Sequence, residues 1–462
     1  MNSRNNKFIN GTSNKNKGKK ETVYFFGWNF VSKAITYLVL FVLANLFSVE
    51  AYGKASYALS IFNLALLFIL MGMPHTFVPW YVKKKDSSSI GYFSLIISLL
   101  FVMLGFVLFW KEIWIFPLII ALPFFLLKGM GESFLRIKHK HHFVQIFGAL
   151  SMLIYLGFLV FFSKFNEMGI TVSFALAHLI VTLILVYLLR GEFFKLFSKI
   201  NINFNSVKNY LKKAFFTTFI AVSFSFLGLI DSFILGLLSN YKNVADYTVS
   251  NSLAGVVMVV PISLSMFLLT RSAEIKNKKK SLEVLKRVVR ISYSFTLLAS
   301  IGLISLLSLV LKYFFPKYLG VEFFVLILLM GTLFLSIYHT IATHYTGKLN
   351  PEKIFYPLGL AAIINILLDI LLIPNYGVYG IVFATVIAHL FAMALLLRTS
   401  NLGSYFLPSI FFSGFIIWAY FLGTLGLVLI APVAVGLVIT GMITKEDRNV
   451  IWKVIKTIFN GN

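Results

Sequence analysis

The sequence contains no cysteine and only 16 acidic residues in a chain of 462. Without cysteine there is no disulfide framework, no thiolate zinc site, no iron–sulfur cluster and no cysteine nucleophile. Charged residues make up 12% and apolar residues 59% of the chain, whereas a soluble domain has about 25% charged residues. Together with a mean hydropathy of +0.89, this excludes a water-soluble globular fold. We expect an all-α polytopic membrane protein.

The motifs of nucleotide and metal chemistry are also absent. The sequence has no phosphate-binding glycine loop and no His-Glu-x-x-His pattern, and it leaves no soluble region that could hold an ATPase. We therefore expect no cofactor, no metal site and no enzyme. A net charge of +25 often indicates a nucleic-acid partner. Here the bases flank apolar runs, so we expect anionic membrane lipids as partners and no nucleic acid.

Fourteen apolar runs approach or exceed the ~20 residues that a membrane-spanning helix needs. They cover approximately residues 24–47, 55–80, 92–110, 113–130, 143–162, 169–189, 214–238, 247–270, 290–312, 323–346, 355–373, 378–397, 405–421 and 426–442.

Lysine and arginine in short loops set the orientation of such a chain. With the N-terminus inside, 34 of the 41 basic residues fall in inner loops or helix ends and 6 in outer loops. This partition predicts an even number of spans and cytoplasmic N- and C-termini. We expect a multi-pass protein of the plasma membrane.

The spans group into two similar halves. Tyr52 and Tyr247 stand in similar sequence settings 195 residues apart, and a lysine cluster follows the second helix of each half. Parallel repeats of this kind are common in transporters. We predict two six-helix bundles related by a parallel pseudo-two-fold axis, plus two C-terminal helices. The expected parts are a basic cytoplasmic N-terminus (1–23), the N-terminal bundle (24–189), a cytoplasmic linker (190–213), the C-terminal bundle (214–397), two extra spans (398–442) and a cytoplasmic amphipathic tail (443–462).

Two cytoplasmic helical segments are expected outside the spans. Residues 281–289 read as an extension of the ninth span, with Ser281 as its N-cap. In the tail, Ile451, Val454, Ile455 and Ile458 form an apolar stripe with i, i+3, i+4, i+7 spacing, which is typical of an interfacial helix.

One stretch is similar to a known family. It runs Asn365-Ile-Leu-Leu-Asp-Ile-Leu-Leu-Ile-Pro-Asn-Tyr-Gly-Val-Tyr-Gly-Ile-Val-Phe-Ala-Thr385. It resembles a stretch of the polysaccharide flippases of the multidrug/oligosaccharidyl-lipid/polysaccharide exporter (MOP) superfamily, as do the segments beginning at Glu50 and Asp231. The resemblance implies a flippase for polyprenyl-pyrophosphate-linked oligosaccharide that works by alternating access. Because no region of the sequence could hold an ATPase, we expect its transport to be driven by an ion gradient, a membrane potential or the substrate's own gradient. The Pro374–Gly377 part also has a purely structural reading, because Pro and Gly together close a tight hairpin.

Polar residues inside the spans are the candidate substrate contacts, since charges in hydrocarbon are costly and usually face a cavity. Lys33 lies about nine residues into the first span, and Asn29 shares its helix face. Asn63 lies on a polar face of the second span, and Arg271 ends the eighth. We predict that these four residues contact an anionic substrate. The alternative for Lys33 and Arg271 is a structural role at the inner interface.

Asp231 and His344 are the candidates for ion coupling through H+ or Na+. Asp231 lies in the seventh span, the repeat partner of the first, and His344 lies on a small and polar stripe of the tenth. The alternatives are a carboxylate that reaches the outer interface and a histidine buried in a helix-packing contact. For Asp369, near the outer end of the eleventh span, we favour the structural reading.

Three other functions stay open. A peptidoglycan lipid-precursor flippase is a close variant. A cation-coupled multidrug antiporter would favour an acidic cavity, and the intramembrane acids here are Asp231 and Asp369. A membrane glycosyltransferase or polymerase would need sizeable outer loops, and every outer connection here is short. Polysaccharide assembly proteins are further expected partners.

Overall fold

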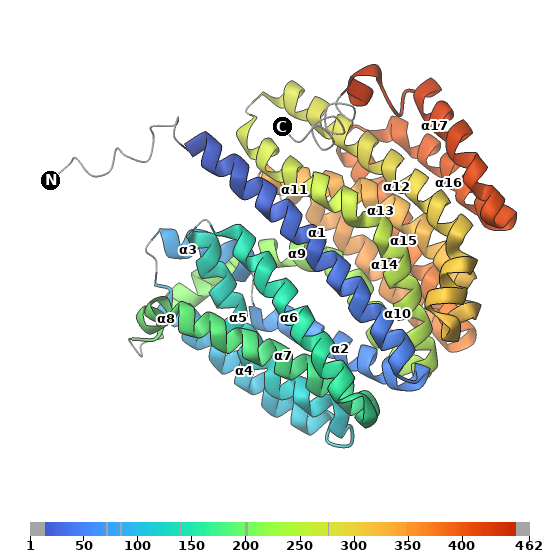
Figure 1. Ribbon diagram of the computed structural model, residues 1–462. Coiled ribbons are helices and arrows are strands. Elements are labelled where there is room, and N and C mark those ends of the chain that lie inside the picture. Colours follow the sequence, from blue (N-terminus) through green and yellow to red (C-terminus); the bar gives the residue numbers. More distant parts are fainter. Residues whose placement is uncertain are drawn as a thin grey trace. The chain divides into compact units, whose positions relative to one another are not determined.

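The computed structural model describes residues 14–70, 73–83, 86–138, 140–198, 202–275, 277–348, 350 and 352–449. These residues are almost entirely helical, with no strand among them, which confirms the predicted all-α class (Figure 1). The tail stripe predicted at 451–458 and most of the basic segment 1–23 lie outside the described residues.

The chain divides into two compact units, which are Met1–Ser48 with Ile61–Thr218, and Val49–Ser60 with Phe219–Asn462. The helices of unit 1 are α1 (Asn14–Leu46), the second part of α2 (Val49–Leu70), a π-helical turn (Met73–Phe77), α3 (Val78–Val82), α4 (Ser88–Leu108), α5 (Phe116–Ile137), α6 (His141–Phe161), α7 (Asn166–Leu188), α8 (Arg190–Phe197) and the start of α9 (Phe204–Leu238). Within this unit α1 packs along α6, and α5 packs on α7 (Figure 1).

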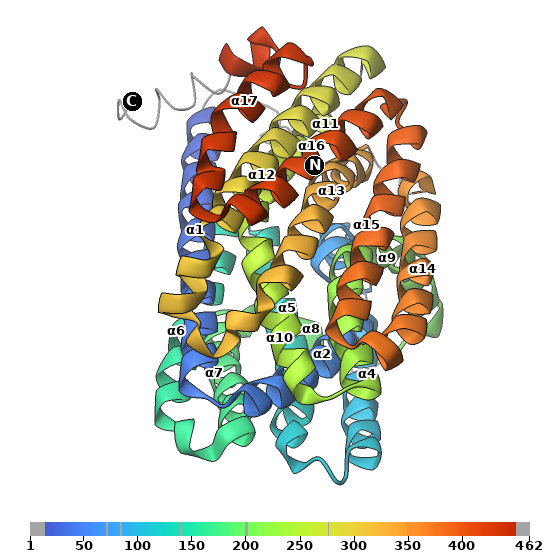
Figure 2. The ribbon, with the colours of Figure 1, turned by 90° about the vertical axis from the view of Figure 1, so that its right-hand side faces the viewer.

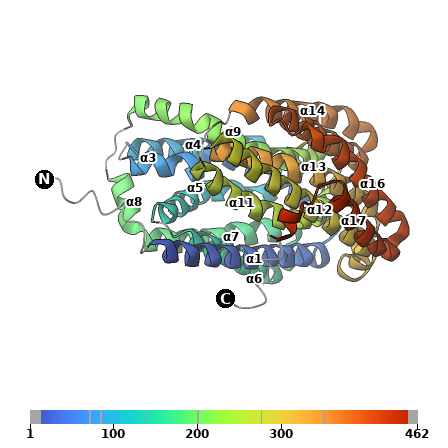
Figure 3. The ribbon, with the colours of Figure 1, turned by 90° about the horizontal axis from the view of Figure 1, so that it is seen from above.

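Unit 2 contains the first part of α2, the end of α9 and the remaining helices. These are α10 (Tyr241–Gly255), α11 (Val259–Glu274), α12 (Lys278–Phe314), α13 (Glu322–Gly347), α14 (Glu352–Tyr376), α15 (Val378–Thr399), α16 (Phe406–Leu422) and α17 (Ile430–Ile439). Helix α13 packs on α10, α11, α12, α15 and α16. In its most apolar stretch 67% of the residues are buried, a larger share than in any other candidate span of the described chain. It is therefore the core of the unit. Helices α14 and α15 lie side by side (Figure 2), and α16 and α17 lie beside α12 (Figure 3).

Twelve helical segments of the described chain are long and apolar enough to cross a membrane. The difference from the fourteen predicted spans arises at two places. In α9 the apolar piece Leu229–Leu238 is too short to count as a span. The last two predicted spans are counted together as Gly403–Ile439, because 3₁₀ turns join α16 to α17. The predicted second span is also interrupted: α2 ends at Leu70, and the π-helical turn and α3 follow.

The first part of α2 is held in unit 2 by close contacts. A Cβ atom on Gly53 would lie 1.7 Å from the backbone oxygen of Tyr241, so the two helices meet at backbone distance. One turn later, Tyr57 stacks on Phe233 with ring centroids 6.1 Å apart and covers Gly236. Both contacts depend on the absence of a side chain at a glycine.

The extension of the ninth span is confirmed, but its predicted N-cap is wrong. Helix α12 begins at Lys278, and the side chain of Asn277 caps it by accepting a hydrogen bond of 3.2 Å from the Lys280 N–H. Ser281 lies inside the first turns and is buried. Asn and Ser cap helices about equally well, and Asn277 comes first in the chain.

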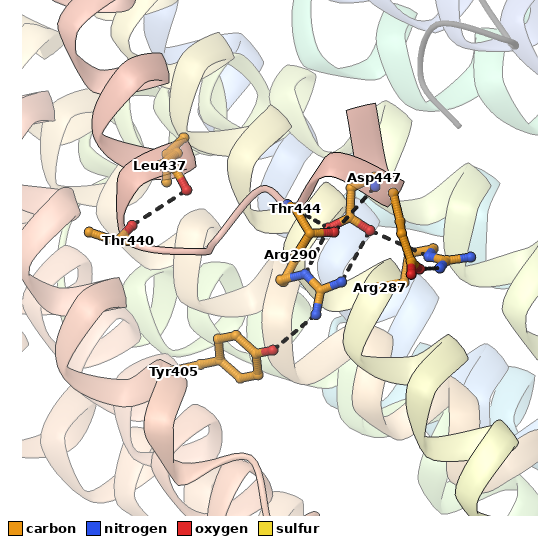
Figure 4. A network of polar contacts seen from close by, with 8 residues as sticks. Arg287, Arg290, Tyr405, Leu437, Thr440, Thr444 and Asp447 are labelled. Atoms are coloured by element: carbon orange, nitrogen blue, oxygen red, sulfur yellow. Dashed lines mark hydrogen bonds and ion pairs between the residues drawn. The ribbon is translucent and has the colours of Figure 1, made fainter. Parts of the chain in front are cut away.

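The end of the described chain is tied to α12 by a network of charges (Figure 4). Asp447 is buried and accepts hydrogen bonds from Arg290, while Arg287 pairs with Asp447 and Glu446. Thr444 and Asp447 also exchange hydrogen bonds as a capping box at the start of a short helix that follows α17.

A second polar junction ties α3, α5 and α8 together in unit 1. Tyr81 donates a 2.9 Å hydrogen bond to Glu192, and Lys138 lies 3.3 Å from the other carboxylate oxygen. Burial alone would raise the pKa of Glu192, but these two partners outweigh it and lower that pKa, while burial and Glu192 raise the pKa of Tyr81 to about 12.

Candidate functional site

Four helices of unit 2 bring five polar side chains together in a buried cluster, which we call the carboxyl cluster. Asp231 comes from α9, Tyr247 from α10, Asn365 and Asp369 from α14, and Thr385 from α15. Four of them are fully buried, and Thr385 is 4% exposed. Burying polar groups in an apolar surrounding is costly unless they find partners, so the contacts within the cluster decide what it can do.

The donors of the cluster converge on one oxygen of each carboxyl group. Tyr247 and Thr385 donate to Oδ2 of Asp231, at 2.5 and 2.8 Å. Asn365 donates through Nδ2 to Oδ2 of Asp369 at 3.3 Å. Asp231 and Asp369 also interact with each other in the cluster. Two carboxylates can share such a contact only through a proton or a bound cation.

Three acceptor oxygens of the cluster have no donor. They are Oδ1 of Asp231, Oδ1 of Asp369 and Oδ1 of Asn365, all of them buried. An unsatisfied buried acceptor costs about 1–3 kcal/mol, and more when it carries charge. Carboxylate and amide oxygens are ligands for hard cations, and one shared proton would satisfy the carboxyl pair. The arrangement therefore suits a desolvated monovalent cation or an exchangeable proton.

The set does not resemble a transition-metal site. Within the described ranges, no group of three or more His, Cys, Asp or Glu residues lies close enough to hold a metal ion. The cluster has two carboxyl groups, and its other oxygens belong to an amide, a hydroxyl and a phenol, which is an oxygen-only environment.

The hairpin between α14 and α15 positions Thr385 opposite α14. Gly377 has φ +53°, a left-handed conformation that favours glycine, and it begins the turn back into α15. A Cβ atom on Gly380 would lie 2.6 Å from the carbonyl carbon of Leu372, so only glycine permits this close approach. The predicted tight hairpin at Pro374–Gly377 is thus confirmed, and it sets the register in which Thr385 reaches Asp231.

The residues predicted for ion coupling separate in the structure. Asp231 lies at the centre of the carboxyl cluster. His344 is 6% exposed, and its hydrogen-bond partner is Ser272 at 2.8 Å. The recorded partner of His344 is therefore a hydroxyl of α11 and not a member of the cluster.

The predicted substrate contacts divide between the units. Lys33 is exposed on α1, and Asn29 and Asn63 are half-buried in the same unit. Among the described residues, none of these three has a hydrogen-bond or ion-pair partner. Arg271, in unit 2, is exposed and pairs with Glu274 at 2.9 Å.

Four members of the carboxyl cluster were not predicted as site residues. Tyr247, Asn365, Asp369 and Thr385 all stood in the segments that carried the family resemblance. The available indication was the i, i+4 spacing of Asn365 and Asp369, which places both side chains on one face of α14. The pairing of that face with Asp231 depends on contacts between residues far apart in sequence.

Several solved structures share the fold of this chain. The structure of lipid II flippase MurJ in an inward closed conformation matches with a TM-score of 0.71 and 18% identity, over 89% of this chain and 98% of that chain. A eukaryotic MATE transporter matches with a TM-score of 0.60 and 15% identity, over 87% and 99%. An inward-facing multidrug resistance MATE family transporter of the MOP superfamily gives 0.58 and 12%, over 85% and 95%. This chain therefore has the fold that MurJ and the MATE transporters share.

The family follows from the sequence itself. A family profile described as "Polysaccharide biosynthesis protein" matches residues 19–270, more than half of the chain. The chain belongs to this family of polysaccharide biosynthesis proteins, which confirms the resemblance found in the sequence. Among curated proteins no significant match was found.

Proposed function

We propose that this protein is a flippase that moves polyprenyl-pyrophosphate-linked oligosaccharide from the inner to the outer leaflet of the plasma membrane. The observation that carries the proposal is the carboxyl cluster, a buried pair of carboxyl groups in a chain that belongs to the polysaccharide biosynthesis family and shares the fold of MurJ. Such a pair is suited to hold an ion or a proton. A transporter without an ATPase region needs another source of free energy, and a cation or proton moving down its gradient supplies it.

Asp231 and Asp369 form the coupling element in this proposal. With a cation or proton bound, the two carboxyl groups can lie close together. Without it, their like charges repel each other in a buried site. The free energy of each packing arrangement of unit 2 then depends on whether the ion is present. Through this difference an ion gradient biases the conformational cycle.

Lys33, Asn29, Asn63 and Arg271 are the proposed substrate contacts. Lys33 has no carboxylate partner in the described part of unit 1, so its charge is available for a pyrophosphate. Arg271 is exposed, and its partner Glu274 lies in a salt bridge of the kind that contributes little at a surface. Anionic membrane lipids and polysaccharide assembly proteins are the further proposed partners.

The test is transport of a fluorescent lipid-linked oligosaccharide in proteoliposomes. Sodium is varied at constant pH, and pH is varied at constant sodium. We expect one of the two gradients to drive transport in the wild type, and the dependence to disappear in Asp231→Asn and Asp369→Asn. Asp246→Asn is the matched control, because Asp246 is on α10 of the same unit and outside the cluster. Unchanged gradient dependence in both cluster variants would refute the coupling role.

A second candidate function is transport of a peptidoglycan lipid precursor, favoured by the fold likeness to MurJ. Both substrates are polyprenyl pyrophosphates that carry sugars, so the same proteoliposomes can compare them directly. Loss of surface polysaccharide on deletion of the gene supports the first function, whereas arrested cell-wall synthesis supports the second. Normal surface glycan with altered drug sensitivity would favour the multidrug antiporter.

A further inference from the structure

A groove opens between the first turns of α14 and the last turns of α15, and it is distinct from the carboxyl cluster. Its volume is about 530 Å³. We call it the α14–α15 groove and define it by Glu352, Lys353, Tyr356, Leu360, Leu395 and Arg398. The two helices lie side by side within unit 2, so the groove belongs to one unit (Figure 2).

One end of the groove is polar and carries a net positive charge. Lys353 and Arg398 are both exposed, and among the described residues neither pairs with a carboxylate. Lys353 lies over the ring of Tyr345 at 5.2 Å, and Arg398 is in the last turn of α15. Glu352, in the first turn of α14, is the acidic member. Two bases and one acid leave a formal charge of +1.

The other end of the groove is apolar and continues along the surface of α14. Leu360, Ile363, Leu367 and Leu371 follow one another at intervals of three or four residues, and 49–65% of each side chain is exposed. Residues with this spacing lie on one face of a helix. From Leu360 to Leu371 the helix rises about 16 Å at 1.5 Å per residue, close to half of the ~30 Å hydrocarbon core. The strip has the length of one leaflet.

We propose that the α14–α15 groove binds a phosphatidylglycerol-class phospholipid, with its phosphodiester between Arg398 and Lys353 and an acyl chain along the apolar strip of α14. Basic pockets between membrane helices commonly hold anionic head groups. The guanidinium of Arg398 offers two parallel N–H donors to the phosphate, and Lys353 supplies a second charge. Glu352 accepts a hydrogen bond from a head-group hydroxyl, and Tyr356 lies at the level of the interface, where tyrosine is enriched.

The groove fits this lipid class better than it fits a zwitterionic phospholipid or a free phosphate ion. One phosphodiester neutralises the +1 of the groove, whereas a zwitterionic phosphatidylethanolamine would leave that charge in place. A free phosphate ion could contact the two bases, but it would leave the apolar strip without an occupant. The groove thus matches a head group and a chain that are covalently joined.

The test uses the purified full-length protein in detergent, with lipid retention measured by native mass spectrometry and melting temperature measured on addition of lipid. The probes are phosphatidylglycerol, phosphatidylethanolamine and inorganic phosphate. We expect phosphatidylglycerol to be retained and to raise the melting temperature, with weaker effects of the other two. In Lys353→Gln/Arg398→Gln, retention should fall about 25-fold, since each base near an anionic head group contributes about fivefold.

The matched control is Lys279→Gln/Lys280→Gln, which removes the same charge from exposed positions of α12 in the same unit. It should retain phosphatidylglycerol as the wild type does. Leu360→Ser should weaken retention of the phospholipid and leave the response to inorganic phosphate unchanged. Equal retention in the double variant and its control would overturn the proposal. If inorganic phosphate raises the melting temperature as much as phosphatidylglycerol does, the proposal that the ligand is a lipid is wrong. If phosphatidylethanolamine is retained as well as phosphatidylglycerol, the proposal of an anionic head group is wrong.

Discussion

The carboxylate of Asp447 accepts two hydrogen bonds from the guanidinium of Arg290, at 2.8 Å from Nε and 3.1 Å from an Nη atom (Figure 4). Asp447 is fully buried, and the two residues are 157 positions apart in sequence. A bidentate pair of this kind fixes orientation as well as distance. It therefore anchors the end of the described chain to the extension of α12.

Asp447→Asn should lower the melting temperature of the protein. The substitution removes a charge-assisted contact, which is worth about 1.5–3 kcal/mol, and leaves Arg290 without its carboxylate. Glu446→Gln is the control, since its side chain is 77% exposed and its pair with Arg287 is at the surface. Thermal unfolding in detergent gives the melting temperature of both variants. Equal shifts in the two variants would show that burial of Asp447 contributes nothing.

The contribution of Asp447 to the stability of the folded protein should disappear in acid. Burial alone would raise its pKa, but hydrogen bonds from Arg290 and Thr444 and the charge of Arg290 outweigh burial and lower the pKa. A folded-state pKa below the unfolded value of about 3.9 gives stability that is present above that value and lost as pH falls through the folded value. The difference in melting temperature between wild type and Asp447→Asn should therefore be constant above about pH 5 and shrink below about pH 4. A difference that grows on acidification would contradict this sign.

Gly53→Ala should destabilise unit 2. The new methyl group would lie 1.7 Å from the backbone oxygen of Tyr241, and backbone cannot move aside as a flexible side chain can. Overpacking typically costs about 1–3 kcal/mol. Gly157→Ala, also within a helix, is the control, because nothing lies within 4 Å of its added Cβ. Yield of folded protein by size exclusion and melting temperature compare the two, and equal values would mean that α2 can shift away from α10.

Lys33→Gln should abolish most transport without loss of folded protein, and Lys33→Arg should keep part of it. Loss of one charge-assisted hydrogen bond, about 1.5–3 kcal/mol, weakens substrate binding about 10–150-fold. Transport in proteoliposomes, normalised to folded protein, measures the effect. If Lys33 has only a structural role, both variants will show lowered stability with unchanged transport per folded molecule.

Cysteine labelling in this cysteine-free chain should report the predicted orientation. Lys83 and Lys242 are both exposed, and the distribution of basic residues assigns them to opposite sides of the membrane. In intact cells an impermeant maleimide should label Lys242→Cys and spare Lys83→Cys, whereas permeabilised cells should show both. The reverse pattern would place the termini outside.

The sequence was sufficient for features that depend on neighbouring residues. Long apolar runs predict membrane helices because no other structure satisfies the backbone in lipid, and the structure bears this out. The Pro374–Gly377 hairpin is also a local feature, because proline restricts the backbone conformation and glycine permits a left-handed one.

Features that depend on long-range packing were not predicted. The structural reading of Asp369 was reasonable from its position near a span end, but it omitted Asp231, which lies 138 positions away in sequence and interacts with it in the structure. The capping box at Thr444 and Asp447 had a local pattern in the sequence. Its partner Arg290 could be assigned only once α12 was seen beside the chain end.

The contact between Gly53 and Tyr241 has a consequence for biosynthesis. The first turns of α2 emerge from the ribosome early, yet the residues that cover them in unit 2 are synthesised 188 positions later. At about 5–20 residues per second, this delay lasts roughly 10–40 s. During that interval the glycine face of α2 has no native partner and must lie against lipid or the insertion machinery. The order in which this chain enters the membrane is therefore not the order in which its helices reach their final neighbours.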